Sequence, residues 1–149
     1  MKDKKQRIIL VGKSQAGKTT LTQCMTDQQL SYHKTQTVQV INDRFIDTPG
    51  EYLEQRGFYG ALSVTAADVD VIALVQSAVE EGTMFAPGFG FMFCGKPVIG
   101  IVTKIDIADE EQMKRADLYL KNAGAAICFP VSSVTGQGVK ELNNWIQEL

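Results

Sequence analysis

The stretch Gly12-Lys13-Ser14-Gln15-Ala16-Gly17-Lys18-Thr19 decides the fold of this chain of 149 residues. An apolar run at 7–11 precedes it, and a segment with helical spacing at 21–29 follows it. Its glycines, lysine and threonine match G-x-x-x-x-G-K-[ST], the pattern of a loop that joins a strand to a helix and holds phosphate groups. We therefore predict a buried strand, a phosphate-binding loop and a helix in that order.

The loop supplies the groups that the phosphates of a nucleotide require. Its backbone N–H groups can point at the β-phosphate, and the N-terminus of the following helix adds its dipole. Lys18 brings a cation to the β- and γ-phosphates, and the Thr19 hydroxyl is a hard oxygen ligand for Mg²⁺. Lys13 is a second lysine near the loop, which we expect to point to solvent. The residues predicted to bind phosphate are Gly12, Lys13, Ser14, Gln15, Ala16, Gly17, Lys18, Thr19 and Thr20.

Short apolar runs alternate with amphipathic segments along the whole chain. Further strands are predicted at 37–41, 44–47, 69–75, 98–102 and 127–131, and further helices at 53–67, 109–122 and 139–149. Strands separated by helices indicate a mostly parallel sheet with helices on both faces. A hairpin at Asn42-Asp43 adds one antiparallel edge strand. We expect one domain, 1–149, with a three-layer α/β fold of about six strands.

Residues 77–95 have no clear periodicity and are rich in glycine and phenylalanine. Aromatic side chains in such a segment more often extend the core than line a ligand site. We therefore expect an irregular segment whose aromatic residues pack against the main core.

Composition excludes several classes of protein. Hydrophobic residues make up 44%, charged residues 21%, and the net charge of −2 argues against a nucleic-acid binder. No apolar window of about 18 residues predicts a membrane span, and the N-terminus lacks a signal-peptide core. The three cysteines, Cys24, Cys94 and Cys128, are odd in number and widely spaced. This pattern favours reduced thiols in a cytoplasmic protein.

A second phosphate-sensing motif, Asp47-Thr48-Pro49-Gly50, follows the strand predicted at 44–47. Asp47 can hold Mg²⁺ through water, and the Gly50 N–H can contact a γ-phosphate. Thr35 and Thr37 both lie between the first helix and the hairpin, and Thr35 is the expected second threonine ligand of the metal because Thr37 is expected to begin the strand. Lys18, Gly50 and Glu51 are the candidate catalytic residues.

The segment Thr103-Lys104-Ile105-Asp106 follows the strand predicted at 98–102 and matches [NT]-K-x-D. The Asp106 carboxylate can accept two hydrogen bonds from N1–H and the 2-amino group of guanine, a donor pair that adenine lacks. The Lys104 stem can lie along the base. Thr103, Lys104 and Asp106 are therefore predicted to bind a guanine nucleotide.

After the last strand, Ser132, Ser133 and Val134 begin a loop similar to one that presents a backbone N–H to guanine O6. The alternative is a helix cap followed by a glycine turn. The motif at 103–106 favours the interpretation that these three residues contact the base.

These motifs, in this order, resemble those of the Era-like branch of the translation-factor class of GTPases. The longer strings KTQTV, IDTPGEYLE, VTAADVDVIALVQSA, APGFGFMF and KPVIGIVTKID resemble one group within it, the ethanolamine- and propanediol-utilisation protein family (EutP/PduV). The resemblance implies a small bacterial cytoplasmic protein associated with a metabolic microcompartment, whose partners are a shell protein or a pathway enzyme. It also implies an acetate kinase activity for the ethanolamine type, and therefore use of ATP.

Three functions remain open at this stage. The first is a switch that binds GTP or GDP with Mg²⁺. Glu51 stands where many small GTPases have a water-orienting Gln, and a carboxylate there repels the γ-phosphate, so hydrolysis should be slow or need a partner's residue. The second is phosphoryl transfer between ATP (or ADP) and a carboxylate such as acetate. The third is a nucleotide-binding scaffold without turnover.

Overall fold

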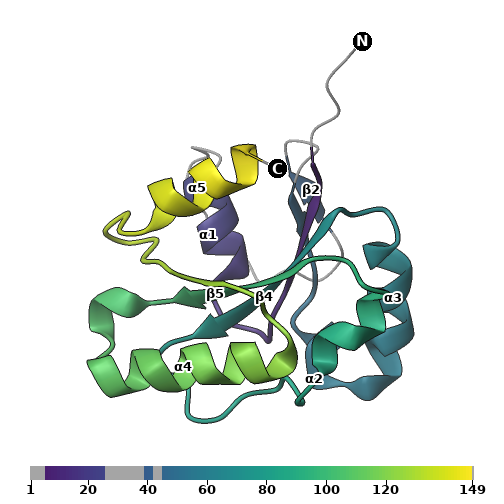
Figure 1. Cartoon of the computed structure of the whole chain (residues 1–149), viewed down its shortest axis with the longest axis horizontal. Coiled ribbons are helices and arrows are strands. Elements are labelled where there is room, and N and C mark those ends of the chain that lie inside the picture. Colours follow the sequence, from purple (N-terminus) through teal and green to yellow (C-terminus); the bar gives the residue numbers. More distant parts are fainter. Residues whose placement is uncertain (1–5, 26–38, 42–44, 149) are drawn as a thin grey trace.

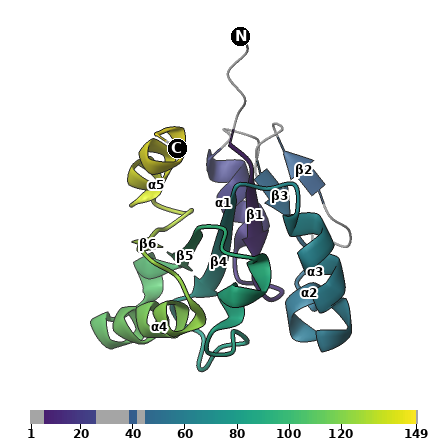
Figure 2. The same cartoon turned by 45° about the vertical axis from the view of Figure 1, so that its right-hand side comes forward.

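The computed structural model describes residues 6–25, 39–41 and 45–148, and contains one six-stranded sheet in the order β2-β3-β1-β4-β5-β6. The antiparallel pair is β2–β3, and all other neighbouring strands are parallel (Figures 1 and 2). The predicted α/β fold, with its antiparallel edge strand, is therefore confirmed. The strands are β1 Ile8–Val11, β2 Gln39–Ile41, β3 Phe45–Asp47, β4 Val71–Ser77, β5 Val98–Thr103 and β6 Cys128–Pro130.

Helices cover both faces of this sheet (Figure 2). Helices α1 and α5 lie on one face, and α2, α3 and α4 lie on the other. None of the helices within the described ranges is long and apolar enough to cross a membrane. The helices are α1 Lys18–Met25, α2 Glu51–Glu54, α3 Tyr59–Ala66, α4 Glu110–Ala123 and α5 Val139–Gln147, with 3₁₀ turns η1 Arg56–Phe58, η2 Phe89–Phe93 and η3 Ile105–Ile107.

The central strands are apolar at consecutive positions because both of their faces are covered. Successive side chains of a strand point to opposite faces. Ile8 and Leu10 therefore belong to the core under α1 and α5, while Ile9 and Val11 belong to the core under α2, α3 and α4. All of β1 and β4 is buried, so these two strands form a rigid base for the loop that follows β1.

The prediction of a single helix at 53–67 is wrong, because the structure has α2, η1 and α3 in this region. Gln55 is extended (φ −124°, ψ 120°) and separates α2 from η1 and α3. Tyr52 stacks on Phe58 with ring centroids 5.1 Å apart and planes 12° apart. An unbroken helix would place residues six apart on different faces, so this stacking requires the break.

The glycine-rich segment after β4 is irregular, as predicted, apart from the 3₁₀ turn η2. Phe85, Phe89 and Phe93 are buried in the core beneath α3 and α4. Their rings meet edge to face, with Phe89 centroids 5.3 Å from Phe85 and 5.7 Å from Phe93. The prediction that aromatic residues here extend the core is confirmed for these three; Phe91 is exposed.

Two polar anchors bracket the chain between β3 and β4. The Thr48 hydroxyl donates a hydrogen bond of 2.7 Å to the Leu10 carbonyl, directly after β3. At the other end, the Lys96 ammonium group donates to the carbonyls of Ala66, Ala67 and Val69 at 2.6–2.9 Å. A cation at the C-terminus of α3 satisfies carbonyls left over by the helix and complements its dipole.

Candidate nucleotide-binding site

The loop between β1 and α1 closes around the side chain of Lys18. Its ammonium group donates hydrogen bonds to the carbonyls of Gly12, at 2.7 Å, and Lys13, at 3.2 Å. Burial lowers the pKa of Lys18, and the negative charges of Asp47 and Glu54 partly oppose this effect. Helix α1 begins at Lys18, earlier than predicted, so the cation lies in the first turn of the helix.

The two glycines of the motif are required by the path of this loop. Gly17 has φ +102°, a conformation that other residues rarely adopt. A Cβ on Gly12 would lie 2.7 Å from the Val75 carbonyl oxygen on β4. The loop therefore lies against β4 with no room for a side chain at Gly12, while at Gly17 the backbone conformation is what favours glycine.

Thr19 and Asp47 bring two oxygen ligands together beside Lys18. The Thr19 hydroxyl donates a hydrogen bond of 2.5 Å to the carboxylate of Asp47, which is fully buried at the end of β3. Mg²⁺ prefers such oxygen ligands and is usually held by one or two protein groups plus phosphate and water. Thr19 and Asp47 fit the metal of a bound Mg²⁺-nucleotide.

The segment after Asp47 lies directly on the phosphate loop. A Cβ on Gly50 would lie 2.1 Å from the Ser14 nitrogen. From α2, the Glu54 carboxylate accepts hydrogen bonds from the Ser14 N–H at 3.1 Å and from its hydroxyl at 2.9 Å. Sequence reasoning missed Glu54, although its position four residues after Gly50 at the start of a helix predicts that it shares the same face.

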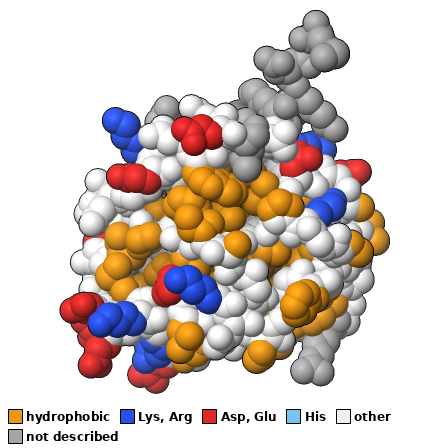
Figure 3. Space-filling view, in the orientation of Figure 1, with side chains coloured by type: hydrophobic (Ala, Val, Ile, Leu, Met, Phe, Trp, Pro, Cys, Tyr) orange, Lys and Arg blue, Asp and Glu red, His pale blue; other side chains and the backbone are white. Residues whose placement is uncertain are grey.

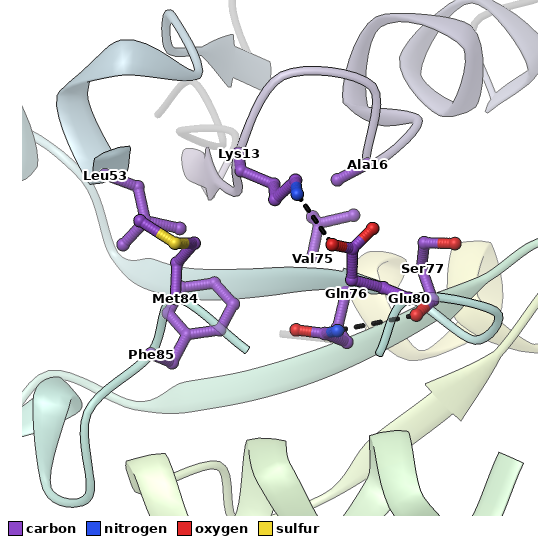
Figure 4. Close-up of a pocket in the computed structure, with 9 residues that line it drawn as sticks. All are labelled: Lys13, Ala16, Leu53, Val75, Gln76, Ser77, Glu80, Met84 and Phe85. Atoms are coloured by element: carbon purple, nitrogen blue, oxygen red, sulfur yellow. Dashed lines mark hydrogen bonds and ion pairs between the residues drawn. The ribbon is translucent and has the colours of Figure 1, made fainter. Parts of the chain in front are cut away.

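The expectation that Lys13 points to solvent is wrong. Its ammonium group forms an ion pair of 2.6 Å with Glu80, from the segment after β4. In Figure 4 the Lys13 side chain extends from the phosphate loop toward Glu80, at a small cleft that Ser77 also lines. Each side chain of the pair is about one-third exposed, so each remains in contact with water.

The predicted base-binding motif after β5 is bonded to the phosphate loop. The Thr103 hydroxyl donates to the Ala16 carbonyl at 2.5 Å, and the Lys104 ammonium group donates to the Gln15 carbonyl at 2.8 Å. Thr103 is buried, so its side chain positions the loop. Lys104 has φ +63°, which turns the chain out of the strand before Asp106.

Asp106 is joined to the loop that follows β6. The Ser132 hydroxyl donates a hydrogen bond of 2.8 Å to the Asp106 carboxylate and accepts one of 3.1 Å from the Thr135 N–H. Ser132 is fully buried while Asp106 is exposed, so a buried hydroxyl orients a carboxylate that solvent can reach. Ser133 is partly exposed, and the Val134 side chain is 84% exposed.

The other residues predicted for the site are Glu51, Thr20 and Thr35. Glu51 is exposed in the first turn of α2, one residue beyond Gly50. Thr20 is partly buried in α1. Thr35 lies outside the described residues. Within the described residues, the side chains predicted to bind the phosphates, the metal and the base lie along the C-terminal edge of the parallel strands. Open α/β proteins bind their ligands at this edge.

This fold and this arrangement of motifs define an α/β protein with the P-loop GTPase fold. The chain belongs to the PduV–EutP family, described as ethanolamine utilisation and propanediol utilisation, whose model matches residues 5–148. The resemblance inferred from the motifs is therefore confirmed.

Two curated relatives align over nearly the full length of both chains. The propanediol utilization protein PduV of Citrobacter freundii is 46% identical over 138 residues, which cover 92% of this chain and 90% of the relative. The probable acetate kinase EutP of Escherichia coli (strain K12) is 31% identical over 144 residues, covering 97% and 91%.

Solved structures support the fold. The translation elongation factor SelB of Methanococcus maripaludis, in complex with the GTP analogue GPPNHP, superposes with a TM-score of 0.70 at 24% identity. Era of Aquifex aeolicus, bound to GDP and AlF₄⁻, gives a TM-score of 0.70 at 21% identity. The chain covers 34% of the SelB chain and 57% of the Era chain, so the likeness concerns only part of each.

Proposed function

We propose that this chain binds a guanine nucleotide with Mg²⁺ and acts as a slow GTPase-type switch in propanediol or ethanolamine utilisation. One observation carries the proposal: hydrogen bonds join the base motif directly to the phosphate loop, through Thr103 to Ala16 at 2.5 Å and Lys104 to Gln15 at 2.8 Å. A nucleotide spans the distance between these two parts, so holding them in fixed register pre-organises the site for base and phosphates together.

Each part of the site has a separate task in binding. The N–H groups of the loop and the Lys18 ammonium group would neutralise the phosphates. Thr19 and Asp47 would hold Mg²⁺, which supplies positive charge to the β- and γ-phosphates when bound. Asp106, oriented by Ser132 at 2.8 Å, would accept the two N–H donors of guanine.

Switching would operate through Gly50 and Glu54, because both contact Ser14 of the phosphate loop. A γ-phosphate at this loop requires them to move, which couples α2 to the presence of the third phosphate. Glu51 cannot donate a hydrogen bond to a γ-phosphate, and its charge opposes hydrolysis. We therefore infer slow intrinsic turnover, raised by a residue of a partner protein.

Titration of GTP, GDP, ATP and XTP with Mg²⁺, by calorimetry, tests the proposal. We expect guanine nucleotides to bind at least about tenfold more tightly than ATP, and Asp106→Asn to shift preference toward XTP. Asp68→Asn, an exposed aspartate at the turn before β4, is the matched control and should shift nothing. Equal or tighter binding of ATP would contradict the guanine assignment, and binding without turnover would favour the scaffold function.

A second candidate function is phosphoryl transfer from ATP to a small carboxylate. Its support is the relative of Escherichia coli at 31% identity, which is named a probable acetate kinase. The same loop and Lys18 would neutralise the transferred group. Formation of acetyl phosphate from ATP and acetate, lost in Lys18→Ala but kept in Lys140→Ala on α5, would place this activity first.

The proposed cellular setting is the cytoplasm, in association with a microcompartment shell protein or a pathway enzyme. The 46% identity to a propanediol utilization protein supports the pathway. Affinity purification of the tagged chain from cells grown on 1,2-propanediol, with GTP or GDP in the buffer, tests it. Recovery of the same proteins with both nucleotides, or of none, would contradict a nucleotide-dependent partner.

A further inference from the structure

The edge of the sheet opposite β2 carries an apolar groove that the nucleotide site does not use. The groove, of about 550 Å³, lies between α4 and the edge strand β6. In Figure 3 hydrophobic side chains gather on this face of the molecule, between α4 and α5 of Figure 1. Leu118 on α4 is 57% exposed there. The lining residues are Val102, Glu110, Met113, Lys114, Asp117, Leu118, Cys128 and Pro130.

Helix α4 borders this groove with a stripe of alternating charge. Glu110, Lys114, Asp117 and Lys121 are spaced by four, three and four residues, which places them along one side of the helix. Within the helix, Lys114 lies 3.5 Å from Glu110, and Lys121 lies 3.0 Å from Asp117. All four side chains remain exposed, by 86%, 76%, 39% and 53% in chain order.

This stripe is complementary to itself under two-fold symmetry. When two α4 helices lie antiparallel about an axis through the middle of the helix, Glu110 of each faces Lys121 of the other, and Lys114 faces Asp117. Met113 packs against the core on one side of the stripe, and Leu118 lies exposed on the other. Opposite charges thus meet at every position of the stripe, beside the apolar groove.

We propose that the groove and stripe, formed by α4 and the adjoining edge of β6, bind a second copy of this chain in an antiparallel two-fold dimer. Such an interface is isologous: the same patch serves both subunits. The charge order argues for this occupant, because a parallel arrangement of two α4 helices would bring like charges together.

The contact is made by side chains, not by strand addition. β6 has three residues, and its last, Pro130, has no N–H to donate to another strand. A proline on a short edge strand blocks pairing between sheets. One 14-residue helix and a strand edge give an interface near the low end of the about 1,200–2,000 Å² of stable complexes. The dimer should therefore be weak and concentration-dependent.

Sedimentation velocity on the full chain, from about 1 to 200 μM, tests the proposal. Lys114→Glu alone and Asp117→Lys alone each place like charges opposite one another twice per dimer, and should weaken association about tenfold or more. The double variant Lys114→Glu with Asp117→Lys restores opposite charges across the interface and should associate within about threefold of the original chain.

The double variant separates dimer formation from helix stability. It breaks both ion pairs within α4, so an effect on the helix alone would make it at least as defective as either single variant. Asp68→Lys, at the turn before β4, controls for the change in net charge made by Asp117→Lys, and far-ultraviolet circular dichroism checks that each variant folds. A chain that stays monomeric at the highest concentration, or a double variant no better than the single ones, would overturn the proposal.

Discussion

The Glu54 carboxylate accepts hydrogen bonds from both the N–H and the hydroxyl of Ser14, at 3.1 and 2.9 Å. The helix after the second motif therefore places a negative charge on the phosphate loop, where a γ-phosphate would approach. The same charge raises the pKa of Lys18 against the effect of burial. Glu54 would thus compete with the proposed nucleotide for the donors of the loop.

We predict that Glu54→Gln increases nucleotide affinity. The amide keeps the shape of the side chain but removes the charge that repels phosphate. Because Glu54 is exposed, the gain should be about two- to tenfold, larger for GTP than for GDP and smaller at high salt. Titration with fluorescent nucleotides measures it. Glu141→Gln, an exposed glutamate on α5 outside the site, is the matched control; weaker binding by Glu54→Gln would show that the carboxylate does not oppose phosphate.

We predict that Gly50→Ala destabilises the protein by about 1–3 kcal/mol, because the new methyl group would lie 2.1 Å from the Ser14 nitrogen. Gly57→Ala provides the comparison: no atom lies within 4 Å of its added Cβ. Its free energy of unfolding should change by less than about 0.5 kcal/mol. Urea unfolding measures both, and equal stabilities would show that α2 does not rest on the phosphate loop.

Removing the Thr103 hydroxyl should loosen the phosphate loop. Thr103→Val keeps the shape but leaves the Ala16 carbonyl without its 2.5 Å partner. We expect a loss of about 1–2 kcal/mol in the free energy of unfolding, together with weaker nucleotide binding. Thr103→Ser keeps the hydroxyl and should behave nearly like the original chain. If both variants lose stability equally, the methyl group matters and the hydrogen bond does not.

Cys128 should react slowly with alkylating reagents. Burial and the neighbouring Asp117 raise the pKa of its thiol to about 12. Since the thiolate is the nucleophile, only about one molecule in ten thousand is reactive at pH 8, and the rate should rise tenfold per pH unit without a plateau through pH 10. Exposed Cys94 serves as the internal reference in mass spectrometry with iodoacetamide.

The experiment is best done at about 1 μM, where the proposed dimer is dissociated. Asp117→Asn should increase the rate at which Cys128 is alkylated, because it removes a negative charge that disfavours the thiolate. A plateau near pH 9, or no response to Asp117→Asn, would contradict this assignment.

The sequence predicts those parts of the site whose chemistry lies within a few consecutive residues. The phosphate loop follows from one motif, Asp47 follows from a second, and the fold follows from both motifs together with the periodicity of the chain. Thr35 falls outside the described residues, and the contacts of Glu51 and Val134 with a nucleotide stay predictions.

Contacts that depend on the folded path of the chain could not be predicted. Lys13 and Glu80 are 67 positions apart, and nothing local shows that the segment after β4 passes the loop. The break at Gln55 was missed because the apolar spacing continues through it, while the stacking of Tyr52 on Phe58 decides the conformation.

In the proposed switch, the anchors at Thr48 and Lys96 would limit how far a conformational rearrangement at the phosphates spreads along the chain. Thr48 fixes the start of the segment between β3 and β4 to the Leu10 carbonyl of β1, and Lys96, just before β5, fixes the other end at the C-terminus of α3. Rearrangement on exchange of nucleotide would then be confined to the stretch between these anchors, which includes α2, η1 and α3. The surface around α2 would then change by the exchange of a few hydrogen bonds, without exposing the core to water.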